Sequence, residues 1–299
     1  MAKTTGRHHT RTAARAAAAA LTAALVATGT SAVAADAPQP SLRARADQPA
    51  AAAAAATPRF NLCGIDSNLF RVCFESTREG GFVPDNSEER GWSGIRAVVK
   101  VDHTGDGRPD GIYTFGNSGS VNYRPPSELW GDDVGYGWDI YNMTFSPGNI
   151  GGDVPSDILA RDSKGDLYLY LGYESGKLAK RTKVGYGWDI YTAFAGNGDL
   201  DGDGKNDFVA RDKSGVLWLY KGTGDADAPY AKRTKIGSGW NTYDWLISTG
   251  DVNRDGRSDL LARDKSGVLW RYEGTGDAAA PYKPKAKISG GWNIYSFLY

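Results

Sequence analysis

The chain has 299 residues and a formal net charge of zero, with 35 basic residues against 35 acidic ones. Proteins that bind nucleic acid by neutralising phosphates normally carry a clear basic excess, so this balance argues against that class. Of the three histidines, His8 and His9 lie in a segment that we expect to be removed. The remaining His103 makes a histidine-based catalytic triad improbable and a His-rich zinc site impossible.

Residues 1–34 have the pattern of a secretory signal peptide. Four basic residues precede an apolar run from about Ala16 to Val26, which is followed by the small-residue triplet 32–34. The run is too short and too rich in alanine for a good membrane span, and a disordered Ala-rich tail is the alternative interpretation. Cleavage leaves a net charge of −4. We therefore expect a secreted, extracellular protein that neither inserts into a membrane nor binds nucleic acid.

Residues 35–58, rich in Ala and Pro, are predicted to be a disordered linker. Export would place Cys63 and Cys73 in an oxidising compartment. They lie ten residues apart around the turn-like sequence 66–68, which favours a hairpin disulfide over a redox role.

A repeat of about fifty residues organises the rest of the chain. The dipeptide Gly-Trp recurs with its tryptophan at 92, 138, 188, 240 and 292, and in the last four copies a tyrosine follows three residues later. An acidic loop, an Ala-Arg-Asp tripeptide and an alternating apolar strand complete the fullest copies. Short β-rich runs separated by Gly, Asp and Ser predict an all-β repeat of about four strands, which is one blade of a propeller.

The two ends of the chain decide the number of blades. The chain stops after the first strand of a repeat, at 292–299, and the hairpin that should follow resembles residues 61–74. We therefore predict a five-bladed β-propeller over 59–299, with blades at about 92–137, 138–187, 188–239 and 240–291, and a fifth formed by 292–299 together with 59–91. An open array or β-helix is the alternative, but it would need no complementary ends.

The acidic loops have the spacing of calcium ligands. Side-chain oxygens at loop positions 1, 3, 5 and 9, a backbone carbonyl at position 7 and Gly at position 6 suit a hard cation. Solvated Asx turns are the alternative interpretation. Two loops fit well: Asp199, Asp201, Asp203, Lys205 (carbonyl) and Asp207, and Asp251, Asn253, Asp255, Arg257 (carbonyl) and Asp259.

The two earlier repeats carry weaker versions of this loop. Asp102, Thr104, Asp106 and Asp110 could form a third, weaker site, because Thr replaces the acid at position 3. In the second repeat, residues 149 and 151 have lost the charges at positions 1 and 3, so we expect no tight calcium there.

From about Trp92 onward the repeats resemble the FG-GAP/VCBS type, the calcium-loop blades of integrin α-chain propellers, and in particular secreted actinobacterial members of that group. The resemblance implies calcium on the two well-formed loops. Five blades instead of seven is a departure, and brings the architecture nearer to five-bladed propeller lectins of the tachylectin-2 type.

Each blade would carry the same surface equipment, which suggests a carbohydrate-binding, lectin-like module of several sites. Aromatic faces suit the C–H side of a sugar ring, and planar polar groups suit its hydroxyls. The candidate ligand residues are Trp138, Tyr141, Trp188, Tyr191, Trp240, Tyr243, Trp292, Tyr295, Arg161, Asp162, Arg211, Asp212, Arg263 and Asp264. The alternative places the Gly-Trp tryptophans in the inter-blade core and makes Arg-Asp a turn ion pair, and we expect Trp218 and Trp270 in the core.

No catalytic residue is predicted, and the chain is interpreted as a binding protein and not an enzyme. Two other functions remain open: a protein-interaction or adhesion module of a secreted assembly, and an extracellular polysaccharide hydrolase or lyase acting through an unrepeated carboxylate pair.

Overall fold

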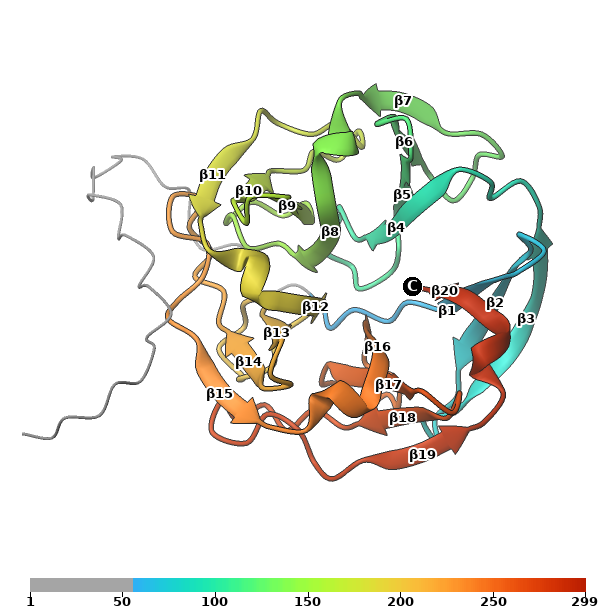
Figure 1. Cartoon of the computed structure of the whole chain (residues 1–299), viewed down its shortest axis with the longest axis vertical. Helices are drawn as coiled ribbons and strands as arrows, with labels where there is room; N and C mark the ends of the chain where they lie inside the picture. Colours follow the sequence, from blue (N-terminus) through green and yellow to red (C-terminus); the bar gives the residue numbers. More distant parts are fainter. Residues whose placement is uncertain (1–55) are drawn as a thin grey trace, which may run out of the picture. The chain divides into compact units, whose positions relative to one another are not determined.

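The computed structural model describes residues 56–299, which form five four-stranded antiparallel sheets arranged in a ring (Figure 1). The predicted all-β, five-bladed propeller is therefore confirmed. The predicted signal peptide and residues 35–55 of the predicted linker lie outside the described residues. Within 56–299 no helix is long and apolar enough to cross a membrane.

Each sheet is one blade, and the blades are numbered from β4. Blade 1 contains β4 (Ile95–Val101), β5 (Gly111–Gly116), β6 (Val121–Arg124) and β7 (Asp132–Gly135). Blade 2 contains β8 (Tyr141–Gly148), β9 (Asp157–Asp162), β10 (Leu167–Tyr170) and β11 (Thr182–Gly185). Blade 3 contains β12 (Tyr191–Gly196), β13 (Phe208–Asp212), β14 (Leu217–Tyr220) and β15 (Thr234–Gly237). Blade 4 contains β16 (Tyr243–Gly250), β17 (Asp259–Asp264), β18 (Leu269–Tyr272) and β19 (Ala286–Ser289).

Blade 5 is built from both ends of the described chain. The last strand, β20 (Tyr295–Leu298), pairs with β1 (Leu62–Asp66), which is followed by β2 (Arg71–Ser76) and β3 (Phe82–Glu89). Cys63 and Tyr299 exchange two backbone hydrogen bonds, and Cys63 forms a disulfide with Cys73 on the neighbouring strand. Both the predicted shared blade and the predicted disulfide are confirmed, and pairing with β20 covers the edge that β1 would otherwise expose.

The Gly-Trp dipeptide marks the start of a blade. Gly137 has a φ of +77°, a left-handed conformation that favours glycine, and it leads into the 3-10 turn η1 (Trp138–Ile140) and then into β8. Three further turns do the same before β12, β16 and β20: η2 (Trp188–Ile190), η3 (Trp240–Thr242) and η4 (Trp292–Ile294). The repeated glycine therefore sets the backbone turn that brings each tryptophan between two blades.

Residues 56–60 run across the ring before entering β1 (Figure 1). Ala56 and Arg59 donate backbone hydrogen bonds to the acidic loop of blade 1, at the carbonyls of Gly105 and Gly107. On the opposite side, Pro58 accepts a hydrogen bond from Asp251 N, and Phe60 donates to the Thr249 carbonyl. The last residues of the predicted linker thus bridge the loops of blades 1 and 4.

Candidate functional site

The acidic loops connect the first and second strands of blades 1 to 4. In blade 3, oxygens of Asp199, Asp201 and Asp207 lie within 4.8 Å of one another. Among residues 56–299 this is the one place where three potential metal ligands of the Asp, Glu, His or Cys type converge. Backbone N–H groups of Gly202 and Gly204 hold Asp199 in place, at 2.6 and 2.8 Å.

The electrostatics of this loop favour a cation. Burial, which strips the charged form of its hydration, and the charges of Asp201 and Asp199 together raise the pKa of Asp207 to about 7, although hydrogen bonds from backbone N–H groups oppose the shift. Lys221 Nζ lies 2.5 Å from Asp201 Oδ2 and supplies one positive charge. The donor set is entirely oxygen, as hard cations require, so the residues fit calcium.

The other loops are held mainly by hydrogen bonds from their own backbone. In blade 4, Asp251 accepts from Asp255 N and Gly256 N, while Asp259 accepts from Val252 N and Gly274 N. Three further side chains of the predicted sets bond within their own loops: Asn253 to Asp255, Asp106 to Arg108 N, and Asp203 to Lys205 N. The nitrogens of Arg257 and Lys205 lie 4.0 Å from the carboxylates of Asp255 and Asp203.

Blade 1 shows a similar arrangement. Asp102 accepts from Gly105 N and Gly107 N, and Asp110 accepts from His103 N and from both the N–H and the hydroxyl of Thr104. His103 itself is buried, with Nε2 3.1 Å from the Tyr113 hydroxyl, and burial lowers its pKa to about 4.

The predicted ligand aromatics are buried between blades. Their exposed fractions are 8% or less, and they pack on neighbouring rings, as Trp138 does on Tyr170 at a centroid distance of 4.2 Å. A buried ring offers no face to a ligand. The structure therefore places these side chains in the inter-blade core, the alternative that the sequence left open: Trp138, Tyr141, Trp188, Tyr191, Trp240, Tyr243, Trp292 and Tyr295.

The arginines of the Ala-Arg-Asp tripeptides are buried as well, and each reaches into the next blade. Arg211 Nη1 donates to the carbonyls of Trp240 and Tyr243, at 3.1 and 2.5 Å. Arg161 and Arg263 make the corresponding bonds to blades 3 and 5. We call this contact the arginine clamp, and its donors are committed to main-chain carbonyls.

The adjoining aspartates serve turns and not the arginines beside them. Asp162, Asp212 and Asp264 each accept backbone N–H groups two and four residues ahead, which closes the turn before the next strand. Burial slightly raises the pKa of Asp264, but hydrogen bonds from Ser266 and Trp270 lower it to about 2. The aspartates therefore take part in turns as the alternative interpretation predicted, but they bond to backbone N–H groups and not to the adjoining arginines.

A second repeated constellation, which the sequence analysis missed, lies on the outer half of blades 2, 3 and 4. Trp218 and Trp270, expected in the core, are half-buried, and each indole N–H donates to an aspartate, Asp212 or Asp264, at 2.8 Å. A cation from the segment before the fourth strand covers each ring. These rim sites, as we call them, are Tyr168 with Arg181 (4.5 Å), Trp218 with Arg233 (4.0 Å) and Trp270 with Lys285 (4.1 Å).

Each rim-site cation also donates to a tyrosine hydroxyl of its own blade: Arg181 to Tyr141, Arg233 to Tyr191 and Lys285 to Tyr243. Asn122 and Val72 hold the equivalent register positions in blades 1 and 5, opposite Thr114 and Gly64. The signal in the sequence was a basic residue that recurs directly before the fourth strand of these three blades, at 181, 233 and 285.

Comparison with known proteins supports the repeat assignment. A sequence model of the FG-GAP-like repeat matches residues 199–262, from the blade 3 acidic loop into β17, which confirms the predicted resemblance over that segment. No curated protein matches the chain.

Similar solved structures include BP39L lectin from Burkholderia pseudomallei, at 14% identity and a TM-score of 0.49 over 76% of this chain and 69% of the other. A triple arginine-to-alanine mutant of AofleA from Arthrobotrys oligospora matches at 9% identity and 0.46, over 79% and 73%. A protein of unknown function from Bacteroides caccae matches at 9% and 0.38, over 77% and 73%. At TM-scores below 0.5 these likenesses carry no argument about the ligand.

Proposed function

We propose that the chain is a secreted, calcium-stabilised propeller that binds carbohydrate at the three rim sites. The observation that carries this proposal is the repetition of a half-buried aromatic ring with a cation stacked on it, on three blades in the same register, joined in blades 3 and 4 by a carboxylate that accepts the indole N–H. Aromatic faces suit the C–H groups of a sugar, and adjoining donors and acceptors suit its hydroxyls. Three equivalent sites raise avidity for a repeating polymer.

Binding is preferred over catalysis because the repeated polar groups already have structural partners. The loop carboxylates accept hydrogen bonds from backbone N–H groups, and the Nη1 groups of the clamp arginines donate to main-chain carbonyls. The disulfide at Cys63 and Cys73 fits an oxidising compartment, which supports export.

The carbohydrate proposal is tested with a panel of immobilised bacterial and plant polysaccharides and with calorimetry. Arg233→Ala/Lys285→Ala removes two of the three cations from exposed or half-exposed positions, and avidity is expected to fall at least about tenfold. The matched control is Lys164→Ala/Lys265→Ala, which removes the same charge from exposed turns of blades 2 and 4. Equal loss in both variants, or no polysaccharide bound by the wild type, contradicts the proposal.

Calcium is tested separately by chelation. Occupancy at a hundredfold excess over Kd would stabilise the fold by about 2.7 kcal/mol per site, so chelation should lower Tm. Asp199→Ala is expected to remove part of that response. Asn149→Ala, at the same loop position in blade 2, should leave it intact. An unchanged Tm on chelation would rule out a stabilising metal.

One observation favours the protein-interaction alternative. Leu129 and Trp130 lie between β6 and β7 of blade 1 and are 82% and 84% exposed. Two adjacent large apolar side chains with so much exposed surface are typical of an interaction site. If this loop docks a protein, Leu129→Ser/Trp130→Ser should abolish a stoichiometric complex and leave polysaccharide binding unchanged. Loss of both activities together would assign the loop to the carbohydrate surface instead.

A further inference from the structure

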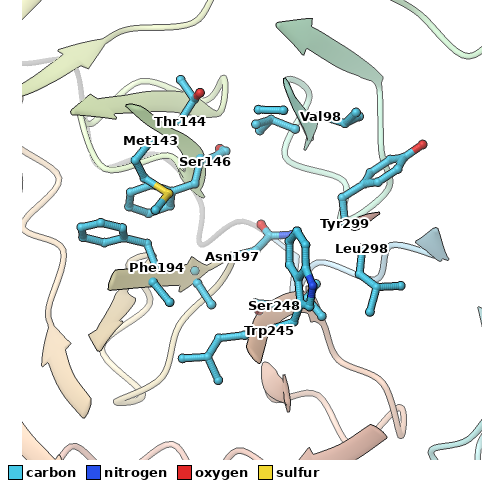
Figure 2. Close-up of a pocket in the computed structure, with 18 of the residues that line it drawn as sticks. Val98, Met143, Thr144, Ser146, Phe194, Asn197, Trp245, Ser248, Leu298 and Tyr299 are labelled. Atoms are coloured by element: carbon cyan, nitrogen blue, oxygen red, sulfur yellow. The ribbon is translucent and has the colours of Figure 1, made fainter. Parts of the chain in front are cut away.

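A cavity of about 400 Å³ runs along the axis of the ring. The first strands of all five blades line it: β4, β8, β12, β16 and β20 (Figure 2). Phe60 lines it at the end where residues 56–60 cross between the acidic loops, while Arg96, Asn142, Thr192 and Asp244 line it near the start of the inner strands. The cavity is therefore a cup with a floor built by the chain itself.

The lining is asymmetric, although the blades around it repeat. The first residue of β8, β12, β16 and β20 is always tyrosine. The third residue of each inner strand lines the cavity and is alanine in blades 1 and 3 but different in each of the others: Ala97, Met143, Ala193, Trp245 and Phe297. One wall is therefore aromatic, with the Trp245 and Phe297 rings 5.2 Å apart, and two alanines leave room elsewhere. Packing of five similar blades does not require this difference between the walls of the cavity. Recognition of one asymmetric small ligand would require it.

Several polar groups in the lining lack partners among residues 56–299, including the buried hydroxyls of Thr144, Thr249 and Tyr299. Asn197 is only 7% exposed and points into the cavity, and none of residues 56–299 hydrogen-bonds its amide (Figure 2). The Trp245 indole N–H is likewise unpartnered among these residues. Both groups are open to water in the cavity, and a ligand group that bonds to them can take the place of that water.

The charged side chains of the lining already have hydrogen-bond or ion-pair partners within the protein. Arg96 donates to the carbonyls of Trp138 and Tyr141, Asp244 holds Arg263, and Lys100 donates to the Asn61 carbonyl. These side chains already use their hydrogen bonds within the protein, so none of them is free to bond an ionic ligand, and burial would penalise a charged molecule.

From this geometry we propose that the axial cavity binds one uncharged small molecule, which combines a planar or alicyclic ring with a carbonyl or amide group. The ring packs on Trp245 and Phe297, and the polar group bonds to Asn197 and the Trp245 N–H. The volume lies at the low end of small-molecule pockets, and the floor at Phe60 excludes a threaded polymer. The site is separate from the rim sites and independent of the carbohydrate proposal.

Benzamide and benzoate are matched probes for this cavity, because they share a ring and differ in charge. With the full chain, saturation-transfer NMR and calorimetry should show benzamide binding at one site, and benzoate at least about tenfold weaker. Trp245→Ala should weaken benzamide at least about tenfold. Ala97→Trp and Ala193→Trp, which fill the cavity from two different blades, should each abolish binding, and a cooperative thermal unfolding transition shows that each variant is folded.

Trp270→Ala is the matched control, since it removes the same side chain from a rim site. It should leave benzamide binding unchanged and weaken polysaccharide binding. Absence of saturable benzamide binding to the wild-type protein overturns the proposal. So does binding that survives both filling variants, or binding that Trp270→Ala removes.

Discussion

Four of the five blade junctions in residues 56–299 carry an arginine clamp, and the junction between blades 5 and 1 does not. In blades 2, 3 and 4 the clamp comes from the second strand, as with Arg211. In blade 1 it comes from the first strand: Arg96 donates to Trp138 and Tyr141 at 2.7 and 2.8 Å. Phe115 stands in blade 1 where Arg211 stands in blade 3. The bond to the next blade is therefore kept although the residue that makes it has moved.

The remaining junction, which we call the seam, lies beside the blade that both chain ends share. Ile65 takes the register position of Arg211 there, and Arg71 lies over the Trp92 ring at 5.2 Å instead. Glu89 of blade 5 pairs with Arg71 at 2.8 Å and with Arg124 of blade 1 at 2.5 Å. The comparison indicates that side-chain-to-carbonyl bonds hold the regular junctions, while the ion pair between Glu89 and Arg124 crosses the seam, beside a blade whose strands β1 and β2 the disulfide joins.

The largest effect is expected from breaking a regular clamp. Arg211→Ala leaves the carbonyls of Trp240 and Tyr243 without their donor in a buried site, and should lower the free energy of unfolding by about 3 kcal/mol. Chemical denaturation measures this. Lys213→Ala, in the same blade but 66% exposed and 3.6 Å from Asp189, is the control and should change it by less than about 0.5 kcal/mol. Similar losses of unfolding free energy in both variants would mean that the clamp stabilises the fold no more than an exposed ion pair does.

The disulfide comes next. Replacing Cys63 and Cys73 together by alanine frees a loop of about ten residues in the unfolded chain, which should cost about 2–3 kcal/mol. Hydrogen exchange would sharpen the comparison, because β1, β2 and β20 should lose protection before the strands of blade 3 do. Uniform loss across all blades would show that the seam is no weaker than the clamped junctions.

How far the sequence predicted this molecule differs between fold and site. The tryptophan spacing and the split repeat predicted the ring, the shared blade and the disulfide correctly, because each follows from counting along the chain. The recurrence of Gly137 and its equivalents could also have been understood as backbone chemistry, since a left-handed glycine before a 3-10 turn is a local feature.

The placement of side chains could not be obtained by counting. A tryptophan at a loop–strand junction fits core and surface equally well, and only the neighbouring blade, which covers Trp138 with Phe115, decides between them. Trp218 alternates with apolar residues as a core side chain would. It is nevertheless half-exposed, because Asp212 accepts its N–H and Arg233 covers its ring from another strand. Such contacts join residues that are distant along the chain or lie in different blades, so the spacing of residues alone does not reveal them.

The smallest effect distinguishes the two kinds of junction by their response to acid. Burial would raise the pKa of Glu89, but the hydrogen bond from Arg124 and the charge of Arg71 outweigh it and lower the pKa. A carboxylate with a lowered folded pKa stabilises the fold above its unfolded value near 4.5, and that contribution disappears as pH falls through the folded pKa. Glu89→Gln should therefore destabilise by less than about 1 kcal/mol at pH 7, given its partial exposure, and by progressively less as the pH falls through the folded pKa towards pH 3. The deficit of Arg211→Ala should stay constant over the same range, because the carbonyls it leaves behind do not titrate. Equal pH dependence of the two deficits, measured by denaturation at both pH values, would mean that ion pairing does not distinguish the seam from the clamped junctions.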